Sequence, residues 1–151
     1  MQAALTNPAS RNSILFLLIA VLSIAGIVLS AISLQRHYAK SATNFCDFSQ
    51  KFSCDIVNRS EYSEIQGIPI AGIGMVGYAV LFALSTYWRS RQETPARLLV
   101  TALAGLGFAL YLTYIEAYVL TTWCILCVGS LVMISVISLL SILVKARTRS
   151  A

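Results

Sequence analysis

The chain has 151 residues, of which 58% are hydrophobic and only 11% are charged. A soluble domain of this size normally carries about a quarter charged residues, so the composition argues against an ordinary soluble protein. The net charge of +5 is compatible with a nucleic-acid partner, but we discount that function. The basic residues flank apolar runs and form no solvated basic face. The length indicates one domain over residues 1–151.

Four long apolar runs follow one another along the chain. They predict transmembrane helices over residues 13–37, 69–88, 97–117 and 125–145. Each supplies roughly the 18–20 apolar residues that cross a bilayer. The first run exceeds the core of a signal peptide, which spans about 7–15 residues, so we interpret it as a membrane span. The predicted fold class is therefore all-α, with four transmembrane helices in a bundle.

The basic residues indicate how the bundle is oriented. Most of them fall before the first run, between the second and third, and after the fourth: Arg11, Arg89, Arg91, Arg97, Lys145, Arg147 and Arg149. An excess of Lys and Arg marks the cytoplasmic side of a membrane. We expect an integral protein of the inner or plasma membrane with both termini in the cytoplasm and all cysteines on the outer side. Arg36 and Lys40 run against this rule.

The outer connection, residues 39–68, carries Cys46 and Cys54. Loops longer than about 12–15 residues are usually functional or disordered, and the apolar residues spread through this one argue against disorder. We expect the part between Asp47 and Asn58 to form a short surface helix that caps the bundle. The outer side is also the oxidising compartment in which disulfides persist.

The fourth apolar run opens on a C-x-x-C motif, Cys124 to Cys127. Positions i and i+3 lie on one face of a helix, so both sulfurs can sit at its first turn. The helix N-terminus favours negative charge, which predicts a stabilised thiolate. We assign that thiolate to Cys127. It lies about 4.5 Å deeper than Cys124, at a rise of about 1.5 Å per residue.

Two cysteine pairs leave three interpretations open. A zinc site would need tighter spacing than that between Cys46 and Cys54. The second interpretation is a non-enzymatic membrane scaffold with two structural disulfides. A redox relay is the third, in which one pair passes electrons to the other through a mixed disulfide. We favour the relay, with a membrane quinone as the acceptor in an apolar slot near Cys127.

Two further ionisable residues lie near the predicted membrane boundary. Glu116 could form an ion pair, reach the interface or relay protons, because an ionisable group at a membrane is a functional candidate. His37, the only histidine, is more simply interpreted as an interfacial side chain.

The cysteine order resembles that of the vitamin K epoxide reductase family, in its bacterial disulfide-forming branch. The matching segments are Cys46-Asp47, Ser53-Cys54, Ser60, Gly67-Ile68-Pro69, Gly77-Tyr78, Tyr111-Leu112 and Trp123 to Cys127. The resemblance covers nearly all of the chain. It implies a four-helix bundle around a quinone, either ubiquinone or menaquinone, capped by the first outer loop.

The resemblance also implies roles for single residues. Cys46 would meet the protein partner, Cys54 would attack Cys124, and Cys127 would face the quinone. Ser60 matches a Ser/Thr of the family's outer loop, and we include it with Cys127 and Leu131 as cofactor-binding candidates. No metal is expected.

Departures from the family refine these expectations. Leu131 stands where the branch that reduces vitamin K has a tyrosine, which makes vitamin K epoxide a doubtful substrate. Many bacterial members carry a fused thioredoxin-like domain, whereas this sequence ends at Ala151. We therefore expect a separate thioredoxin-fold (DsbA-like) protein of the periplasm or another extracytoplasmic space as partner. Four-span oxidoreductases of the DsbB type carry the two cysteine pairs in the reverse order.

Overall fold

The computed structural model describes residues 8–38 and 49–150. Its elements in chain order are α1 (Pro8–Tyr38), α2 (Cys54–Asn58), the 3-10 turn η2 (Glu61–Ser63), β1 (Glu64–Ile65), β2 (Ile68–Pro69), α3 (Ile70–Thr86), α4 (Thr94–Tyr114), the π-helical η3 (Ile115–Leu120) and α5 (Ile125–Ser150). The predicted all-α membrane bundle with a capping segment is confirmed.

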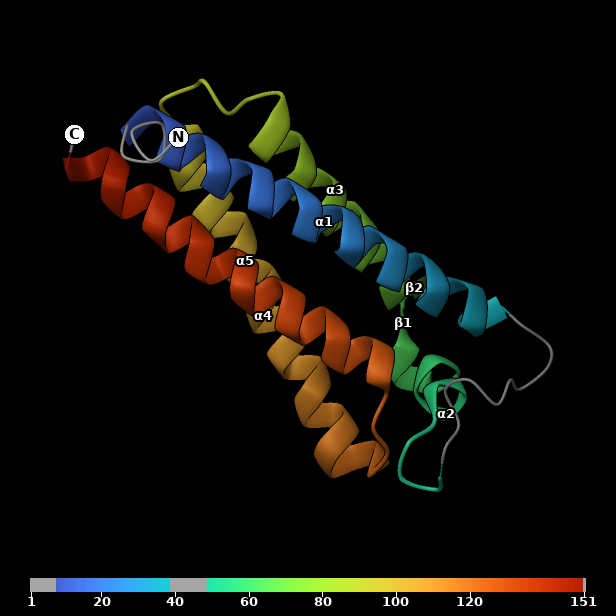
Figure 1. The fold of residues 1–151 in the computed structure, drawn as a ribbon. Helices are drawn as coiled ribbons and strands as arrows, with labels where there is room; N and C mark the ends of the chain where they lie inside the picture. The colour runs from blue at the N-terminus through green and yellow to red at the C-terminus, as the bar shows by residue number, and fades with distance from the viewer. Residues whose placement is uncertain (1–7, 39–48, 151) are drawn as a thin grey trace.

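The long helices run lengthwise beside one another (Figure 1). Helix α1 packs mainly on α3 and α5, and α4 packs mainly on α5. The start of α1, the end of α5 and the α3–α4 connection lie at one end of the bundle. Helix α2 and the two short strands lie at the other end (Figure 1). The predicted cytoplasmic basic segments are therefore together at one end, and Cys54, Cys124 and Cys127 lie at the other.

Within residues 8–38 and 49–150, three segments are long and apolar enough to cross a membrane: Asn12–Tyr38, Thr94–Leu120 and Ile125–Ser150. Helix α3 is apolar but has 17 residues, about 25 Å of helix at about 1.5 Å per residue. A bilayer core is about 30 Å thick. Tyr87 and Trp88 follow α3 and are exposed, as aromatic residues at a membrane interface commonly are.

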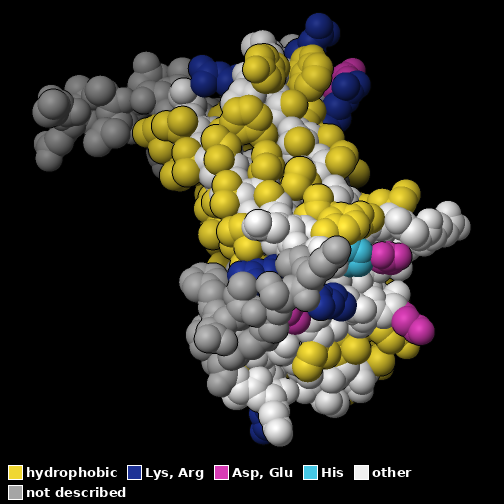
Figure 2. Space-filling model, turned by 90° about the vertical axis from the view of Figure 1, so that its right-hand side faces the viewer, with side chains coloured by type: hydrophobic (Ala, Val, Ile, Leu, Met, Phe, Trp, Pro, Cys, Tyr) yellow, Lys and Arg dark blue, Asp and Glu magenta, His cyan; other side chains and the backbone are white. Residues whose placement is uncertain are grey.

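The distribution of polar groups fits a lipid environment. Large apolar side chains are exposed along α1, among them Leu17, Val21 and Val28, whereas Ser23 is buried. The hydroxyl groups of Ser23, Ser138 and Ser141, all buried, donate to the carbonyl four residues earlier, as Ser141 does to Ile137 (2.7 Å). Figure 2 shows hydrophobic side chains over the helical part and charged side chains towards its ends. Small polar residues inside a bundle allow the close packing on which membrane helices depend.

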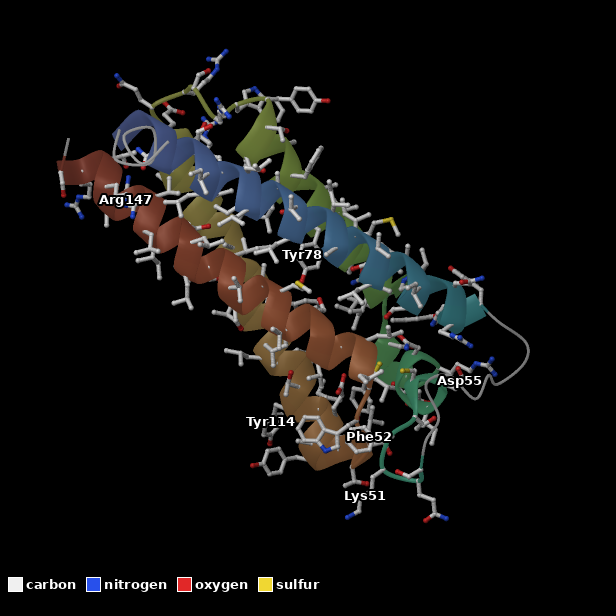
Figure 3. All side chains as sticks on the ribbon, in the orientation of Figure 1. Lys51, Phe52, Asp55, Tyr78, Tyr114 and Arg147 are labelled. Carbon is white, nitrogen blue, oxygen red and sulfur yellow. The ribbon has the colours of Figure 1, made fainter. Side chains whose placement is uncertain are left out.

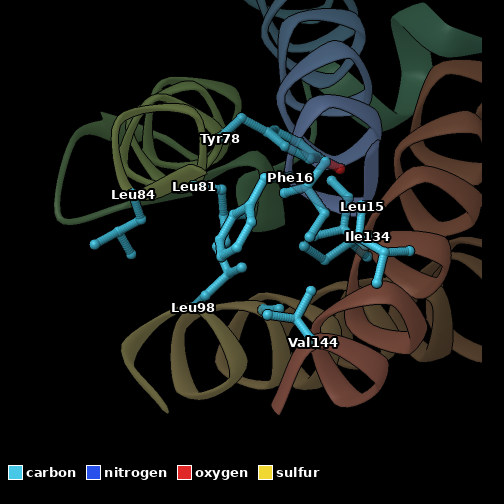
Figure 4. Packing of buried hydrophobic residues seen from close by; sticks show 11 residues of the cluster. Leu15, Phe16, Tyr78, Leu81, Leu84, Leu98, Ile134 and Val144 are labelled. Atoms are coloured by element: carbon cyan, nitrogen blue, oxygen red, sulfur yellow. The ribbon is translucent and has the colours of Figure 1, made fainter. Parts of the chain in front are cut away.

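The main core lies between the four long helices of the described part, and Figure 4 shows it from close by. Its fully buried side chains include Ile19, Leu98 and Ile137. The ring of Tyr78 crosses from α3 over Gly26 of α1, where a Cβ atom would collide with it. The Tyr78 hydroxyl reaches α5, where it bonds Ser130 O (2.9 Å) and Ser130 Oγ (2.8 Å). Tyr78 therefore ties three helices together.

A tight hairpin connects the cap, which we define as residues 49–69, to the bundle. Strands β1 and β2 pair antiparallel, with Ile65 opposite Ile68. The two turn residues, Gln66 and Gly67, both have positive φ (54° and 81°), as a two-residue hairpin turn of this kind requires. The chain then enters α3 at Pro69, which fixes where the cap meets the membrane helices.

Candidate redox site

Cys124 and Cys127, the inner pair, lie at the start of α5. The first residue of α5 is Ile125, and the Cys124 carbonyl accepts the N–H of Val128 (3.0 Å). Cys124 is therefore the residue that caps the helix. It is fully buried, whereas Cys127 is partly exposed, and both are free thiols.

The helix N-terminus acts on Cys124 rather than on Cys127. The Cys127 thiol hydrogen-bonds to the Cys124 sulfur and lowers the pKa of Cys124. The backbone N–H groups of Cys127 and Leu126 act in the same direction, against burial and the charge of Glu116. The sequence predicts the stabilised thiolate at Cys127. The structure gives it to Cys124, because the capping position receives the unpaired amides of a helix.

A short backbone pairing holds the cap against the inner pair. The Trp123 N–H donates to the Lys51 carbonyl (2.8 Å), and the Ser53 N–H donates to the Trp123 carbonyl (3.1 Å). Phe52 and Trp123 thus form a parallel bridge, and Figure 3 shows Phe52 and Lys51 at this end of the molecule. The pairing involves residues immediately before Cys54 and Cys124, so it sets these two cysteines side by side.

Cys54 is fully buried at the first position of α2. The Ser53 side chain begins this helix by accepting the N–H of Ile56 (3.3 Å). Cys54 and Cys124 belong to one buried cluster with Leu126, and Cys127 packs against it. Cys54 is disulfide-bonded. Cys46, its predicted companion in the outer pair, lies outside the described residues.

Asn58 bridges the two cysteines and was not found by sequence reasoning. Its Nδ2 donates to the Cys54 carbonyl (2.9 Å) and to the Cys124 sulfur (3.8 Å). The side chain is buried, and an N–H donor at a sulfur stabilises its thiolate form. Its spacing of four residues from Cys54, on the same face of a short helix, was the available signal.

The way in which α4 ends brings Glu116 close to the inner pair. The helix widens there into η3, and Thr121 takes a left-handed conformation (φ 49°) that ends it. The chain then turns back, and Glu116 Oε2 accepts the N–H of Cys124 (3.2 Å). The carboxyl group also hydrogen-bonds to the Cys127 side chain. Glu116 is only 2% exposed.

His37 joins the end of α1 to the cap. Its Nδ1 lies 2.6 Å from the Asn58 carbonyl, and its Nε2 lies 2.8 Å from Glu64 Oε1. Both partner atoms can accept a hydrogen bond from the ring. His37 therefore supports the helix that presents Asn58, a role beyond that of an isolated interfacial side chain.

A cavity of about 370 Å³ opens beside the inner pair. Its walls are mainly apolar and include Leu29, Leu81, Phe108, Leu112 and Ile134. Polar groups also line it: Cys127, Glu116, Asn58, Ser60, His37, and Tyr78 with Ser130. Small-molecule sites typically combine apolar walls with a few placed polar groups in about 300–1,000 Å³.

Of the three candidate cofactor-binding residues, two line this cavity and one does not. Cys127 and Ser60 both line the cavity, with the Ser60 hydroxyl bonded to the Val57 carbonyl (2.8 Å). Leu131 lies on α5 but is not among the described residues that line the cavity. A flat quinone ring with two carbonyl oxygens and an apolar tail fits apolar walls with hydrogen-bonding groups beside a thiol.

A dithiol that lies between a disulfide-bearing cap and an apolar cavity defines a class of protein, the membrane thiol–disulfide oxidoreductases. Comparison with protein-family models agrees with this geometry. The model of the vitamin K epoxide reductase family matches residues 17–142. This chain belongs to that family, whose members are integral membrane oxidoreductases that generally use a quinone or vitamin K as the electron acceptor.

The first prediction concerns the Cys124 thiolate. In a chain with Cys46 and Cys54 replaced by Ala, the absorbance of the thiolate should reveal a group that ionises below the usual pH for cysteine. Adding Cys127→Ala removes the main hydrogen-bond donor, so the remaining thiol should ionise at a higher pH. If the pH at which Cys124 ionises stays the same or falls when Cys127 is replaced, the Cys127 thiol is not what lowers the pKa of Cys124.

Proposed function

We propose that this chain oxidises the dithiol of a thioredoxin-fold protein and passes the electrons to a membrane quinone, thereby supporting disulfide-bond formation. The observation that carries the proposal is the burial of Cys54 directly against Cys124, beside a cavity that Cys127 lines. The coexistence of a disulfide at Cys54 with two free thiols supports a relay over two permanent structural disulfides.

The proposed transfer begins at the outer pair. A thiolate of the partner attacks Cys46, and the partner leaves with its own disulfide, so that Cys46 and Cys54 become thiols. Cys54 then attacks Cys124 in the oxidised inner pair and releases Cys127 as a thiolate. Attack of Cys46 on Cys54 restores the outer disulfide and leaves two electrons on Cys124 and Cys127.

The inner pair then returns to its disulfide. One S–S bond forms between Cys124 and Cys127, and two electrons and two protons leave the pair. A bound quinone supplies the acceptor for both electrons and both protons. The chain's own contribution is to hold Cys127 at the cavity, to keep Cys124 ready as a thiolate, and to exclude water with the cap.

The order of transfer predicts which mixed disulfide can be trapped. In Cys127→Ala no Cys124–Cys127 disulfide can form, so the Cys124 thiolate should attack Cys54 in the outer disulfide, releasing Cys46 as a thiol and leaving a Cys54–Cys124 bridge. Turnover should stop, because without Cys127 the inner pair cannot return to its own disulfide. Non-reducing mass spectrometry of peptides identifies the bridge, and Cys127→Ala combined with Cys54→Ala is the matched control. A bridge from Cys46 to Cys124 in the single variant would show that the order is wrong.

Two glycines of α3 allow a matched test of the cavity. Both have open space where a Cβ atom would stand, but Gly77 lines the cavity and Gly72 does not. Gly77→Leu should fill the cavity and lower the rate of quinone reduction at limiting quinone by about tenfold, the effect of roughly 1.4 kcal/mol of lost binding. Gly72→Leu should leave that rate within about twofold. Equal effects of the two substitutions would argue against this cavity as the quinone site.

We also propose that the cysteine end faces the outside of the membrane. The basic residues at the opposite end favour the cytoplasm, and a disulfide persists in an oxidising compartment. Alkaline phosphatase fused after Ala151 should therefore be inactive, whereas the same enzyme inserted at Gln50 should be active. The reverse pattern would place the redox site in the cytoplasm and overturn the proposed partner.

A further inference from the structure

Glu116 is a buried carboxyl group that the relay of thiols described above does not use. It lies on η3 with 2% of its surface exposed and lines the same cavity as Cys127. Burying a carboxyl group at membrane depth is costly unless it is bound by hydrogen-bond donors. A residue retained at such a cost beside two reactive thiols calls for a chemical explanation.

The contacts of Glu116 connect it to both members of the inner pair. Oε2 accepts the backbone N–H of Cys124 (3.2 Å), which fixes the carboxyl group in place. The same carboxyl group also interacts with the Cys127 side chain, so a proton acceptor lies beside that thiol. The carboxyl group is therefore close to both sulfurs of the inner pair and, like Cys127, lines the cavity in which the electron acceptor is proposed to bind.

We infer that Glu116 is the proton acceptor for Cys127 when the inner pair is oxidised, an inference that rests on the proposed function. The S–H bond of Cys127 breaks as its proton moves to Glu116, and the sulfur bonds to Cys124. Two electrons leave the pair for the acceptor. Glu116 passes its proton to an acceptor oxygen and returns to the carboxylate. The second proton, which Cys124 gave up when it ionised, reaches the acceptor from water.

This assignment makes Glu116 a catalytic residue, because it touches a reacting sulfur. A positioned proton acceptor typically contributes about 10²–10⁴-fold to a rate. Glu116→Gln is the informative substitution. The amide oxygen can still accept the Cys124 N–H and keep the site assembled, but the amide takes up no proton. Glu116→Asp keeps the carboxyl group on a shorter side chain, and Glu61→Gln alters an exposed carboxyl of the cap as a matched control.

The test uses the full-length chain, purified, fully reduced and mixed under anaerobic conditions with a short-tailed ubiquinone analogue. The loss of quinone absorbance in one turnover is the first measurement. The second needs no quinone: the rate at which iodoacetamide alkylates Cys127, followed by mass spectrometry. The wild-type chain and the three variants are compared in both measurements.

Glu116→Gln should slow quinone reduction by about a hundredfold without slowing alkylation, since it removes a negative charge that opposes the Cys127 thiolate. Glu116→Asp should retain more of the quinone rate than Glu116→Gln, and Glu61→Gln should match the wild type in both measurements. The inference is overturned if Glu116→Gln reduces quinone within about threefold of the wild type. It is also overturned if its alkylation falls in parallel, because Glu116 would then only hold the site together. A wild-type chain that reduces no quinone would instead overturn the proposed function.

Discussion

The burial of Cys54 against Cys124 is the constraint on which the rest of the site depends. It is set by the backbone, since the bonds that align the cap join main-chain groups of Lys51, Ser53 and Trp123. Disulfide exchange requires one sulfur to approach another along a defined direction, and a paired backbone fixes that approach better than flexible side chains can. The Asn58 amide then adds one donor at the Cys124 sulfur, which is the sulfur that Cys54 is proposed to attack.

The helices enclose an apolar cavity next to the Cys54–Cys124 contact and still pack closely against one another. Tyr78 braces α1, α3 and α5 at one level through Gly26 and Ser130. Beyond that level, towards the cap, Gly74 and Gly77 line the cavity. A void costs the dispersion contacts that its lining would otherwise make, so a cavity of this size in a small bundle is best understood as a site for an apolar ligand. The polar groups at the inner pair restrict how such a ligand could lie.

Much of this arrangement could be predicted from the sequence, because its main signals are local. Apolar runs of membrane length predict the helices, and the C-x-x-C spacing predicts two sulfurs at the start of the last one. Other features depend on contacts between distant segments, such as the pairing of Phe52 with Trp123 and the hydrogen bond from Cys124 to Glu116. Depth in the membrane favours Cys127 as the thiolate, whereas the capping position of Cys124, which decides the matter, depends on where α5 begins. Leu131 was selected by family position, and its helix places it away from the cavity lining.

The number of quinones that each reduced chain consumes is the most direct test of a relay through Cys54 and Cys124. The chain has four cysteines, so full oxidation of the reduced protein forms two disulfides, and each disulfide should consume one quinone. An anaerobic titration of the reduced wild-type chain should therefore end at about two quinones per chain. Replacing Cys54 by Ala disconnects the outer pair and should lower the end point to about one. Oxidation that needs dioxygen and consumes no quinone, or an end point that Cys54→Ala leaves unchanged, would contradict a relay through Cys54 and Cys124.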